Sequence, residues 1–214
     1  MDPRLLLLAD GRFPAGGHAH SAGVEAAIAY GDVTDEEQLD RYLRARLATT
    51  GVTDAAFAAA SVTATDRGAL DAELLARILS PRLREVGMRM GRQLLRAGRR
   101  VFPDTTLDAL DGCQQPIVLG ALVGAAGGSP HDAAIITMHH LAAAVTSAAV
   151  RLLGLDPIAV AAIQAGVAPL IDELVAPAAD WAAAAPRDLP ALGGALTDIL
   201  GEDHGHWTAR LFVA

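Results

Sequence analysis

Histidine is the side chain in this 214-residue sequence best placed to do chemistry, because four of the seven histidines form two His-x-His pairs. The pairs are His18 with His20 and His204 with His206. In an extended segment, side chains two residues apart point the same way, so each pair could give two imidazole ligands to Ni²⁺ or Zn²⁺. A strong site needs further ligands and supporting carboxylates, and only the second pair has acidic neighbours. Two interpretations follow: solvated histidines, which is the simpler one, or a weak metal site, alone or across a dimer.

Motifs of the common catalytic and nucleotide-binding sites are absent from the sequence. It has no Gly-x-Ser-x-Gly, no His-Glu-x-x-His and no phosphate loop, since the glycines of 11–17 lack the Gly-Lys-Ser/Thr ending. The single cysteine, Cys113, has no neighbour that would lower its pKa. A metal-dependent hydrolase would need inward carboxylates at helical spacing, whereas the acidic runs 35–37 and 172–173 are typical of exposed helix turns. We therefore expect neither catalysis nor a cofactor.

Composition and charge limit the class of protein further. Apolar residues make up 52% of the chain and charged residues 20%, which predicts a folded domain rather than a disordered chain. The net charge of −8 argues against a nucleic-acid partner, and the basic cluster 89–100 is explained as one face of a helix. Histidine, threonine, serine and arginine interrupt the apolar stretch 133–155, which favours a buried helix over a membrane span. A lone cysteine and the lack of a signal-peptide pattern predict a cytoplasmic protein.

The pattern of helix starts and breakers predicts an all-α fold. No segment alternates apolar and polar residues as a strand would, and a Ser-Pro or Asp-Pro pair that caps a helix recurs three times. We expect a single domain, 1–214, of about eight to ten helices, with mainly irregular chain at 98–112 and 177–190. The expected helices cover 21–30, 34–50, 54–66, 70–79, 81–96, 116–126, 130–154, 157–175 with a bend at Pro169, and 192–200.

Five positions carry more detailed expectations. Thr34 and Glu37 have the spacing of a capping box. Gly51 is expected to end the helix that follows, and Asp54 to cap the next one. Gly91 lies in a helix interior, where glycine costs about 1 kcal/mol relative to alanine, so a close helix crossing is expected there.

Four segments, in order along the chain, resemble the UreF family of urease accessory proteins. Residues 5–25 run from four leucines through Phe-Pro and Gly-Gly to Ser-x-Gly-x-Glu, which is similar to the opening signature of the family. Residues 84–95 resemble its Arg-x-x-Met-Gly-x-x-Leu-Leu pattern, and 116–152 its Pro-x-x-x-Gly to Ser-Ala-x-x-Arg-Leu pattern. Residues 204–212 resemble its closing segment, which ends in Arg-Leu-Phe.

The resemblance implies a helical, homodimeric cytosolic protein that is not an enzyme. Such a protein would join UreD (also called UreH) and the GTPase UreG in a complex that delivers nickel to apo-urease, and would modulate GTP hydrolysis by UreG. No membrane and no nucleic acid are implied. His18, Ala19 and Gly205 depart from the aromatic, Ser/Thr and glutamate residues usual in the family.

By position, the resemblance places partner binding on the segment after the Gly-Gly pair and on the C-terminal tail, 201–214. An Arg-Leu-Phe tail pairs a planar cation with apolar anchors, as interface hot spots do. The tail is interpreted either as a frayed end of the free protein or as a recognition element. The partner-binding residues expected are Gly16, Gly17, His18, His20, Ser21, Glu25, Arg210, Leu211 and Phe212. The alternative is a nickel-binding metallochaperone with His18, His20, His204 and His206 as ligands.

Overall fold

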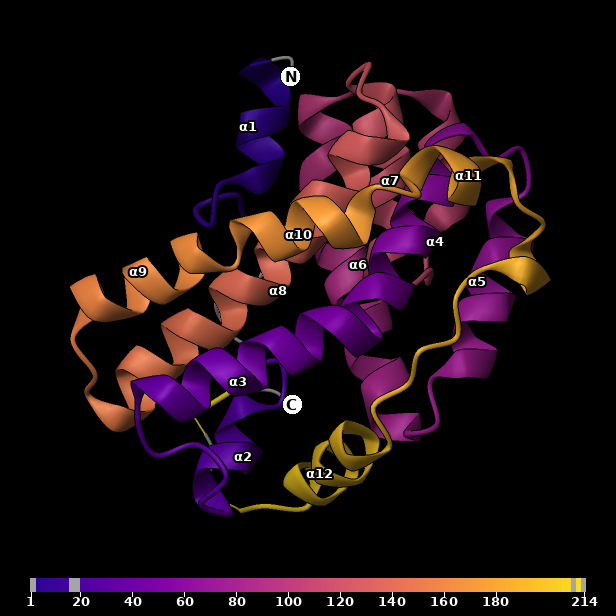
Figure 1. Ribbon diagram of the computed structural model, residues 1–214. Helices are drawn as coiled ribbons and strands as arrows, with labels where there is room; N and C mark the ends of the chain where they lie inside the picture. Colours follow the sequence, from indigo (N-terminus) through magenta and orange to yellow (C-terminus); the bar gives the residue numbers. More distant parts are fainter. Residues whose placement is uncertain (1–2, 16–19, 209–210, 213–214) are drawn as a thin grey trace.

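The chain folds into helices, and a computed structural model describes residues 3–15, 20–208 and 211–212 (Figure 1). No β-strand occurs within these ranges, which confirms the all-α prediction. The α-helices are α1 (Pro3–Ala9), α2 (Val24–Ala29), α3 (Glu36–Arg46), α4 (Val52–Thr63), α5 (Arg67–Arg77), α6 (Pro81–Val101), α7 (Gln115–Ala125), α8 (Pro130–Leu153), α9 (Pro157–Gly166), α10 (Ala168–Val175), α11 (Ala178–Ala183) and α12 (Ala195–Gly205). A π-helical turn covers Leu47–Gly51, and 3-10 helices cover Thr105–Leu110 and Pro186–Asp188.

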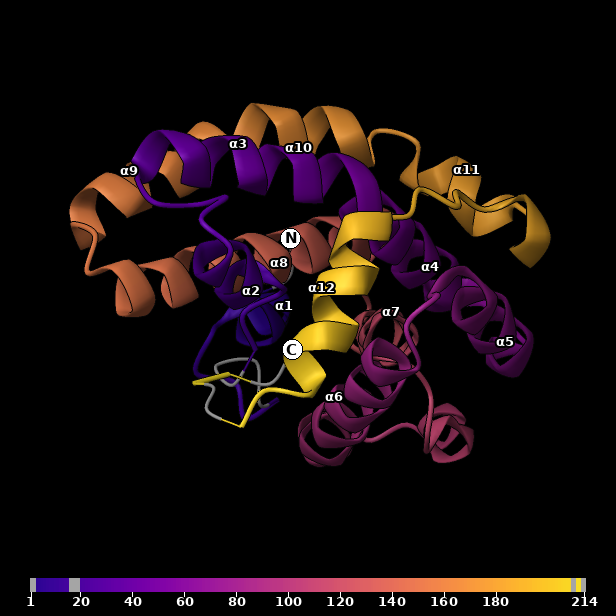
Figure 2. The ribbon, with the colours of Figure 1, turned by 90° about the horizontal axis from the view of Figure 1, so that it is seen from below.

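The core is built around α4, which packs against both α7 and α8 (Figures 1 and 2). Glycine lets α4 and α7 approach closely, because a Cβ atom on Gly120 would collide with the main-chain oxygen of Ala58. A Cβ atom on Gly124 would likewise lie 2.7 Å from the main-chain oxygen of Val62. The small side chains of the sequence thus pack as backbone-to-backbone contacts rather than as a core of large aromatic rings.

The prediction for the start of α3 is wrong by one residue. Asp35, not Thr34, is the N-cap, and its carboxylate accepts a hydrogen bond from the main-chain nitrogen of Gln38 at 2.9 Å. The main-chain nitrogen of Thr34 in turn donates to Gln38 Oε1 at 2.7 Å. Aspartate caps a helix at least as well as threonine, and glutamine can replace glutamate three residues after the cap. A helix that starts one residue later than predicted therefore still has acceptors for a first-turn amide and for the main-chain nitrogen of Thr34.

The expected helix end at Gly51 and cap at Asp54 are also wrong. The π-helical turn joins α3 to α4 without a break, and Gly51 has a helical φ of −57°. A Cβ atom on Gly51 would lie 3.0 Å from Leu141 of α8, so the glycine allows two helices to touch rather than ending one. Asp54 is therefore inside the helix, in the first turn of α4.

Other boundaries differ where tertiary contacts extend or create a helix. Helix α6 continues to Val101, and the region 177–190, expected to be irregular, contains α11, which is held to the core by the buried Trp181. Helix α12 runs to Gly205, so the tail does not begin at residue 201 as expected. The bend near Pro169 is confirmed as a break between α9 and α10.

Two stretches are long and apolar enough to cross a membrane by length and composition alone. The first, Pro130–Leu153, is α8, and 56% of its most apolar 18 residues are buried in the protein. The second, Pro157–Val175, comprises α9 and α10 and is only 17% buried. Figure 2 shows α9 and α10 at the periphery of the molecule, beside α3 and α8. The first stretch is the core helix that the sequence predicts.

Candidate functional site

One buried carboxylate, that of Glu25 in α2, holds together three parts of the chain. Its Oε2 atom accepts a hydrogen bond from His204 Nε2 of α12 at 2.7 Å. The main-chain nitrogen of Leu211 donates to Oε1 at 2.8 Å, and that of Phe212 donates to Oε2 at 3.1 Å. Because hydrogen bonds to an ionised group are stronger than neutral ones, Glu25 fixes both α12 and the C-terminal segment on α2. We call Glu25, His204, Leu211 and Phe212 the tail junction.

The turn before α2 directs Glu25 into the tail junction. Ala22 and Gly23 both have positive φ, at 50° and 84°, which reverses the chain immediately before the helix. A Cβ atom on Gly23 would lie 3.0 Å from the hydroxyl of Tyr42, so glycine suits this position for both conformation and space. The Tyr42 hydroxyl donates to the main-chain oxygen of Ala22 at 3.2 Å and secures the turn to α3. A carboxylate in the first turn of a helix is also favoured by the helix dipole.

The two apolar residues of the C-terminal segment have different roles. Phe212 is 3% exposed, and the guanidinium of Arg151 lies 4.8 Å from the centre of its ring. Arg151 also donates to Ser147 Oγ at 3.2 Å, which aligns it on α8. Leu211, by contrast, is 73% exposed. Phe212 therefore anchors the segment inside the protein, whereas Leu211 faces solvent.

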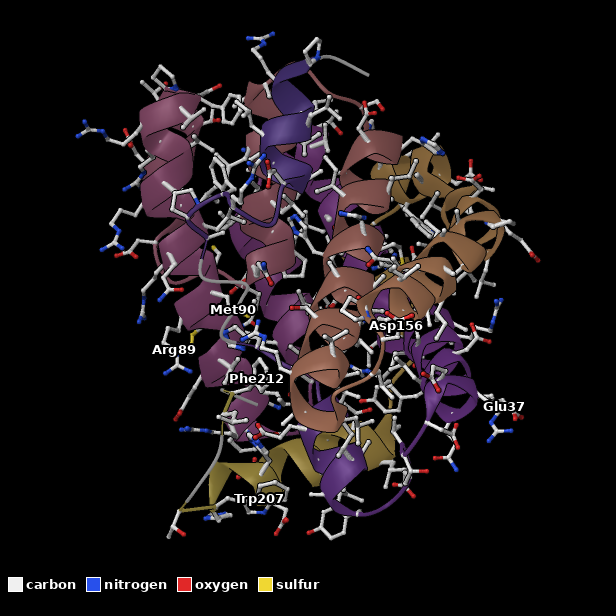
Figure 3. The ribbon with its side chains drawn as sticks, turned by 90° about the vertical axis from the view of Figure 1, so that its left-hand side faces the viewer. Glu37, Arg89, Met90, Asp156, Trp207 and Phe212 are labelled. Carbon is white, nitrogen blue, oxygen red and sulfur yellow. The ribbon has the colours of Figure 1, made fainter. Side chains whose placement is uncertain are left out.

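Aromatic contacts attach the end of α12 to α2 next to the tail junction. Figure 3 labels Trp207 at this end of α12 and Phe212 of the tail junction. The carboxylate of Asp203 accepts hydrogen bonds from the Tyr30 hydroxyl and, at 2.9 Å, from Trp207 Nε1. These hydrogen bonds lower the pKa of Asp203. The ring of Trp207 lies 4.8 Å from that of His204 and 6.2 Å from that of Tyr30. Residues 204 and 207 thus form part of a packed helix end.

Carboxylates of α12 also cap the start of α6. Glu202 accepts from the hydroxyl of Ser80 at 2.6 Å and from the main-chain nitrogen of Arg82 at 3.2 Å, and these hydrogen bonds lower the pKa of Glu202. Asp198 accepts from the main-chain nitrogen of Ser80 at 3.2 Å. The first amides of a helix need acceptors, so α12 and α6 stabilise each other. The tail junction is consequently connected to the long helix α6.

The geometry expected for the second histidine pair is not present. His204 lies in α12 and His206 directly after it, so the pair is not extended and the two side chains do not share a side. His204 is 1% exposed, and its Nε2 atom is already bonded to Glu25. Across residues 3–15, 20–208 and 211–212, no group of three or more His, Cys, Asp or Glu side chains is arranged to hold a metal ion.

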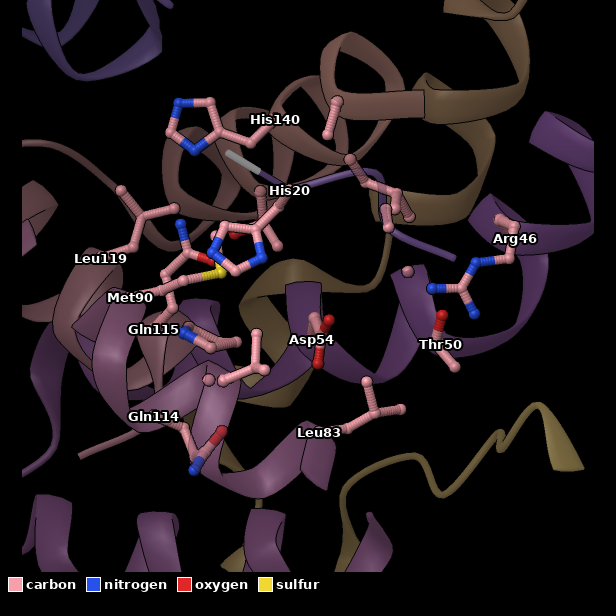
Figure 4. A pocket seen from close by; sticks show the side chains of 18 of the residues that line it. His20, Arg46, Thr50, Asp54, Leu83, Met90, Gln114, Gln115, Leu119 and His140 are labelled. Carbon is pink, nitrogen blue, oxygen red and sulfur yellow. The ribbon is translucent and has the colours of Figure 1, made fainter. Parts of the chain in front are cut away.

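A cavity of about 350 Å³ lies between α4, α6, α7 and α8 (Figure 4). Burial raises the pKa of Asp54, which faces this cavity, to about 6, and the nearby Arg46 only partly offsets the effect. Burial lowers the pKa of His140 to about 4, so this imidazole is neutral at pH 7 and donates from Nε2 to the main-chain oxygen of Leu8 at 2.7 Å. His20, of the first histidine pair, is buried at the cavity wall.

Comparison with known proteins identifies the relatives of this chain. A family model described as UreF matches residues 33–168. The urease accessory protein UreF of Mycobacterium sp. (strain JLS) is 39% identical over 212 residues, covering 98% of this chain and 97% of the relative. The UreF of Mycolicibacterium vanbaalenii is 38% identical over 215 residues, and that of Mycobacterium tuberculosis 35% over 216, each with 98% and 97% coverage. The chain belongs to the UreF family. The resemblance seen in its sequence is thereby confirmed.

The structure places some of the residues expected to bind partners in this UreF family member. Glu25, Leu211 and Phe212 meet in the tail junction, and Ser21 is fully buried close by in the sequence. His20 instead faces the cavity. Four of the expected residues lie outside the described part of the chain: Gly16, Gly17, His18 and Arg210.

Sequence reasoning missed two roles in the UreF fold. His204 is considered there only as a metal ligand, but it is the hydrogen-bond partner of Glu25. Arg151 is considered there only as part of the Ser-Ala-x-x-Arg-Leu pattern, but its guanidinium contacts the Phe212 ring. The resemblance of 204–212 to the closing segment of the family is the signal that groups His204 with Phe212, although it does not reveal the contacts of either residue.

Proposed function

We propose that this protein is a scaffold for urease maturation, joining a UreD/UreH-type protein and the GTPase UreG for GTP-dependent nickel insertion into apo-urease. Membership of the UreF family supports an accessory role in urease maturation. The observation that carries the proposal is the tail junction, in which Glu25 holds Leu211 and Phe212 on α2. Two segments that lie at opposite ends of the sequence can therefore contribute to one partner-binding surface.

Within this surface, the expected residues divide into contact residues and positioning residues. Leu211 is exposed and can touch a partner directly, and Arg210 is its neighbour in the chain. Ser21, Glu25 and Phe212 are buried, so they act by fixing the backbone of the segments around them. The remaining residues proposed for partner binding are Gly16, Gly17, His18 and His20. Recruitment of the GTPase then depends on a tail held in one conformation, because an ordered tail loses less entropy on binding.

The proposal includes no catalytic activity and no cofactor. It rests on the absence of catalytic motifs from the sequence and on the accessory role of the family. Direct nickel delivery through the histidine pairs is the weaker candidate, because His204 Nε2 is engaged by Glu25 and cannot ligate a metal without breaking that hydrogen bond. Tight stoichiometric Ni²⁺ binding by calorimetry, lost in a His204→Ala/His206→Ala variant, would favour the metallochaperone instead.

We also propose a cytoplasmic homodimer that binds neither nucleic acid nor membrane. Helix α1 exposes Leu6 and Leu7, which are 58% and 49% accessible to solvent, and an apolar pair on a short helix is suited to burial between subunits. The acidic net charge opposes binding to nucleic acid and to anionic lipid.

Co-purification with the UreD and UreG equivalents of the same source tests the scaffold proposal. The wild-type protein is expected to hold both partners in one complex. The variant Arg210→Ala is expected to keep its fold but to recruit less of the GTPase, whereas Arg187→Ala, which truncates an arginine of another surface, recruits as much as wild type. Failure of the wild-type protein to bind either partner contradicts the proposal, and equal recruitment by Arg210→Ala contradicts the role of that residue.

A further inference from the structure

Helix α6 concentrates positive charge in an otherwise acidic protein. Seven of its 21 residues are arginines and only one, Glu85, is acidic, which gives the helix a formal charge of +6. Because the whole chain has a charge of −8, the remaining residues together carry −14. This separation of charge is a surface property, and it is not explained by the packing of the core or by the contacts of the tail junction.

The exposed arginines of α6 form a single row. They are spaced by three and four residues, apart from the adjacent last two, so they share one face of the helix. At 1.5 Å per residue, the row is about 16 Å long. We define the arginine stripe as Arg89, Arg92, Arg96, Arg99 and Arg100.

Packing of the opposite face of α6 fixes the direction of the stripe. Val86, Leu94 and Leu95 are buried, and a Cβ atom on Gly91 would collide with the main-chain oxygen of Cys113. The helix therefore cannot rotate to bury its arginines. Figure 3 shows Arg89 projecting away from the body of the protein beside α6.

Groups of the same chain neutralise the stripe only weakly. Arg92 faces Asp111 and Arg99 faces Asp108, each at the long distance of 3.8 Å and each with a largely exposed carboxylate. Exposed pairs of this kind contribute little to stability. Within the described residues, the side chains of the other three members of the stripe make no ion pair or hydrogen bond: Arg89, Arg96 and Arg100. Like charges at these spacings destabilise a helix by a few tenths of a kcal/mol per pair, so the arrangement favours an external partner.

We propose that the arginine stripe is a docking surface for an acidic face of another protein in the urease-maturation assembly. Arginine suits this role because its planar guanidinium binds carboxylates through two parallel hydrogen bonds. The inference rests on the proposed function, since it takes the occupant from the same assembly. The partner it fits presents a short row of carboxylates, such as one face of an acidic helix, over about 16 Å.

Charge and length argue against the two other possible occupants. A nucleic acid longer than the stripe would extend over a surface that carries −14, at distances comparable to the screening length of about 8 Å at physiological salt. The acidic helix α3 of a second copy is a poor occupant, because its Glu37 is paired with Arg41 and its Asp40 with Arg44.

The test compares charge reversal on the stripe with an equal reversal elsewhere. Arg89→Glu/Arg96→Glu reverses the charge of the first and third arginines of the stripe, and Arg41→Glu/Arg187→Glu changes two exposed arginines outside it by the same total charge. Binding to the separately purified UreD equivalent, UreG equivalent and apo-urease is measured by calorimetry at 50 and 300 mM NaCl. We expect the stripe variant to bind one of the three at least ten-fold more weakly at 50 mM NaCl, and the matched control to stay within two-fold of wild type. Arg89→Lys/Arg96→Lys, which keeps the charge, should retain most of the affinity.

The outcomes separate this inference from the proposed function. If wild type binds none of the three proteins, the proposed function and the stripe inference fail together. If wild type binds but the stripe variant binds equally well, only the stripe inference fails. Binding of a 20-base-pair DNA duplex that depends on the stripe, or loss of self-association in the stripe variant by light scattering, would identify a different occupant and also overturn it. If the charge-reversed variant does not fold, Arg89→Gln/Arg96→Gln replaces it, with at least a three-fold loss of affinity expected.

Discussion

Glu25 shows how a single side chain can determine the order of a chain end. Its carboxylate receives hydrogen bonds from one side chain and two main-chain amides, and the residues that supply them lie 179 to 187 positions away in the sequence. Two of the three bonds involve main-chain nitrogen, so they fix the path of the tail regardless of which side chains it carries. The exposed side chains of the tail are thereby free to serve recognition.

Replacing Glu25 by glutamine is expected to release the C-terminal segment. The glutamine amide offers one acceptor oxygen, and its NH₂ group would face an N–H donor, so at least one hydrogen bond of the tail junction is lost. The free energy of unfolding should fall by roughly 2–3 kcal/mol, as for a buried donor left without an acceptor. Hydrogen exchange of the amides of Leu211 and Phe212, followed by mass spectrometry, should become at least ten-fold faster.

Glu85→Gln is the matched control for this change, since Glu85 is exposed and only weakly paired with Arg82 at 3.4 Å. It should leave both stability and exchange as in wild type. Unaltered protection of the C-terminal amides in Glu25→Gln would show that the tail is held by the Phe212 ring alone.

Asp54 is expected to make the fold less stable as the pH rises. Its pKa of about 6 in the folded protein is above the ordinary value of 3.8, so between these values the folded state holds a proton that the unfolded state has lost. Stability from this group is therefore present below pH 4, falls as the pH rises to 6, and stays low above it. Asp54→Asn removes this penalty and should raise the free energy of unfolding by up to about 3 kcal/mol at pH 8.

Urea unfolding at pH 5 and pH 8 measures this effect. The stabilisation by Asp54→Asn should be larger at pH 8 than at pH 5, whereas Asp180→Asn, at an exposed position of α11, should show no such difference. A stabilisation that is absent or equal at both pH values would mean that the cavity already solvates the carboxylate.

At the scale of the element, local signals predicted the helices that begin at a Ser-Pro or Asp-Pro pair better than the boundaries expected at Thr34, Gly51 and Asp54. Ser80, Ser129 and Asp156 all cap helices as expected, because the cap and the proline that follows it act within a few residues. The helix end predicted at Gly51 is wrong because the glycine serves a contact that is distant in the sequence: it makes room for Leu141 of α8. From the sequence alone, a glycine that ends a helix cannot be told from one that lets a second helix pack closely against it.

Gly91 is a case in which the prediction of a close crossing is confirmed, and it can be tested directly. In Gly91→Ala the new Cβ atom would overlap the main-chain oxygen of Cys113, which cannot move as a flexible side chain does. Although alanine favours the helix, the variant should lose roughly 1–3 kcal/mol of stability because the contact between α6 and the start of α7 is forced apart. Thermal unfolding checks the loss.

Gly166→Ala provides the comparison, because nothing lies within 4 Å of a Cβ atom at that position in α9. This variant should be neutral or slightly stabilised. If the two substitutions have the same effect, the close approach of α6 to Cys113 does not constrain the fold.

For the whole molecule, the resemblance grouped residues from both ends of the sequence as partner-binding residues, which stays a prediction, and it did not show how they meet. Glu25, Leu211 and Phe212 are assigned together through the resemblance to UreF, and no spacing rule relates positions 186 or 187 residues apart. His204 was considered only for the chemistry of its own side chain, since its partner could not be inferred from its neighbours. Long-range contacts, unlike caps, become visible only in the folded chain.

The free protein is expected to be a dimer in solution. Alanine-rich helices bury little area per residue, and apolar side chains such as Leu6, Leu7 and Ile158 remain exposed on the single chain. Light scattering at micromolar concentration should give about twice the chain mass of 22.0 kDa. Because the contact is apolar, 0.5 M NaCl should not dissociate it. A monomer at this concentration, in low or high salt, would contradict the prediction.

Cys113, whose carbonyl sets the spacing between α6 and the start of α7, also determines how the protein can be labelled. It is the single cysteine of the sequence, its side chain is buried, and its pKa is raised to about 11. At pH 7 only about one molecule in ten thousand carries the reactive thiolate. A cysteine introduced at Arg89 would therefore take up a maleimide fluorophore alone, with the native residue left in place. Such a probe could report in real time when a second protein approaches that side of the molecule.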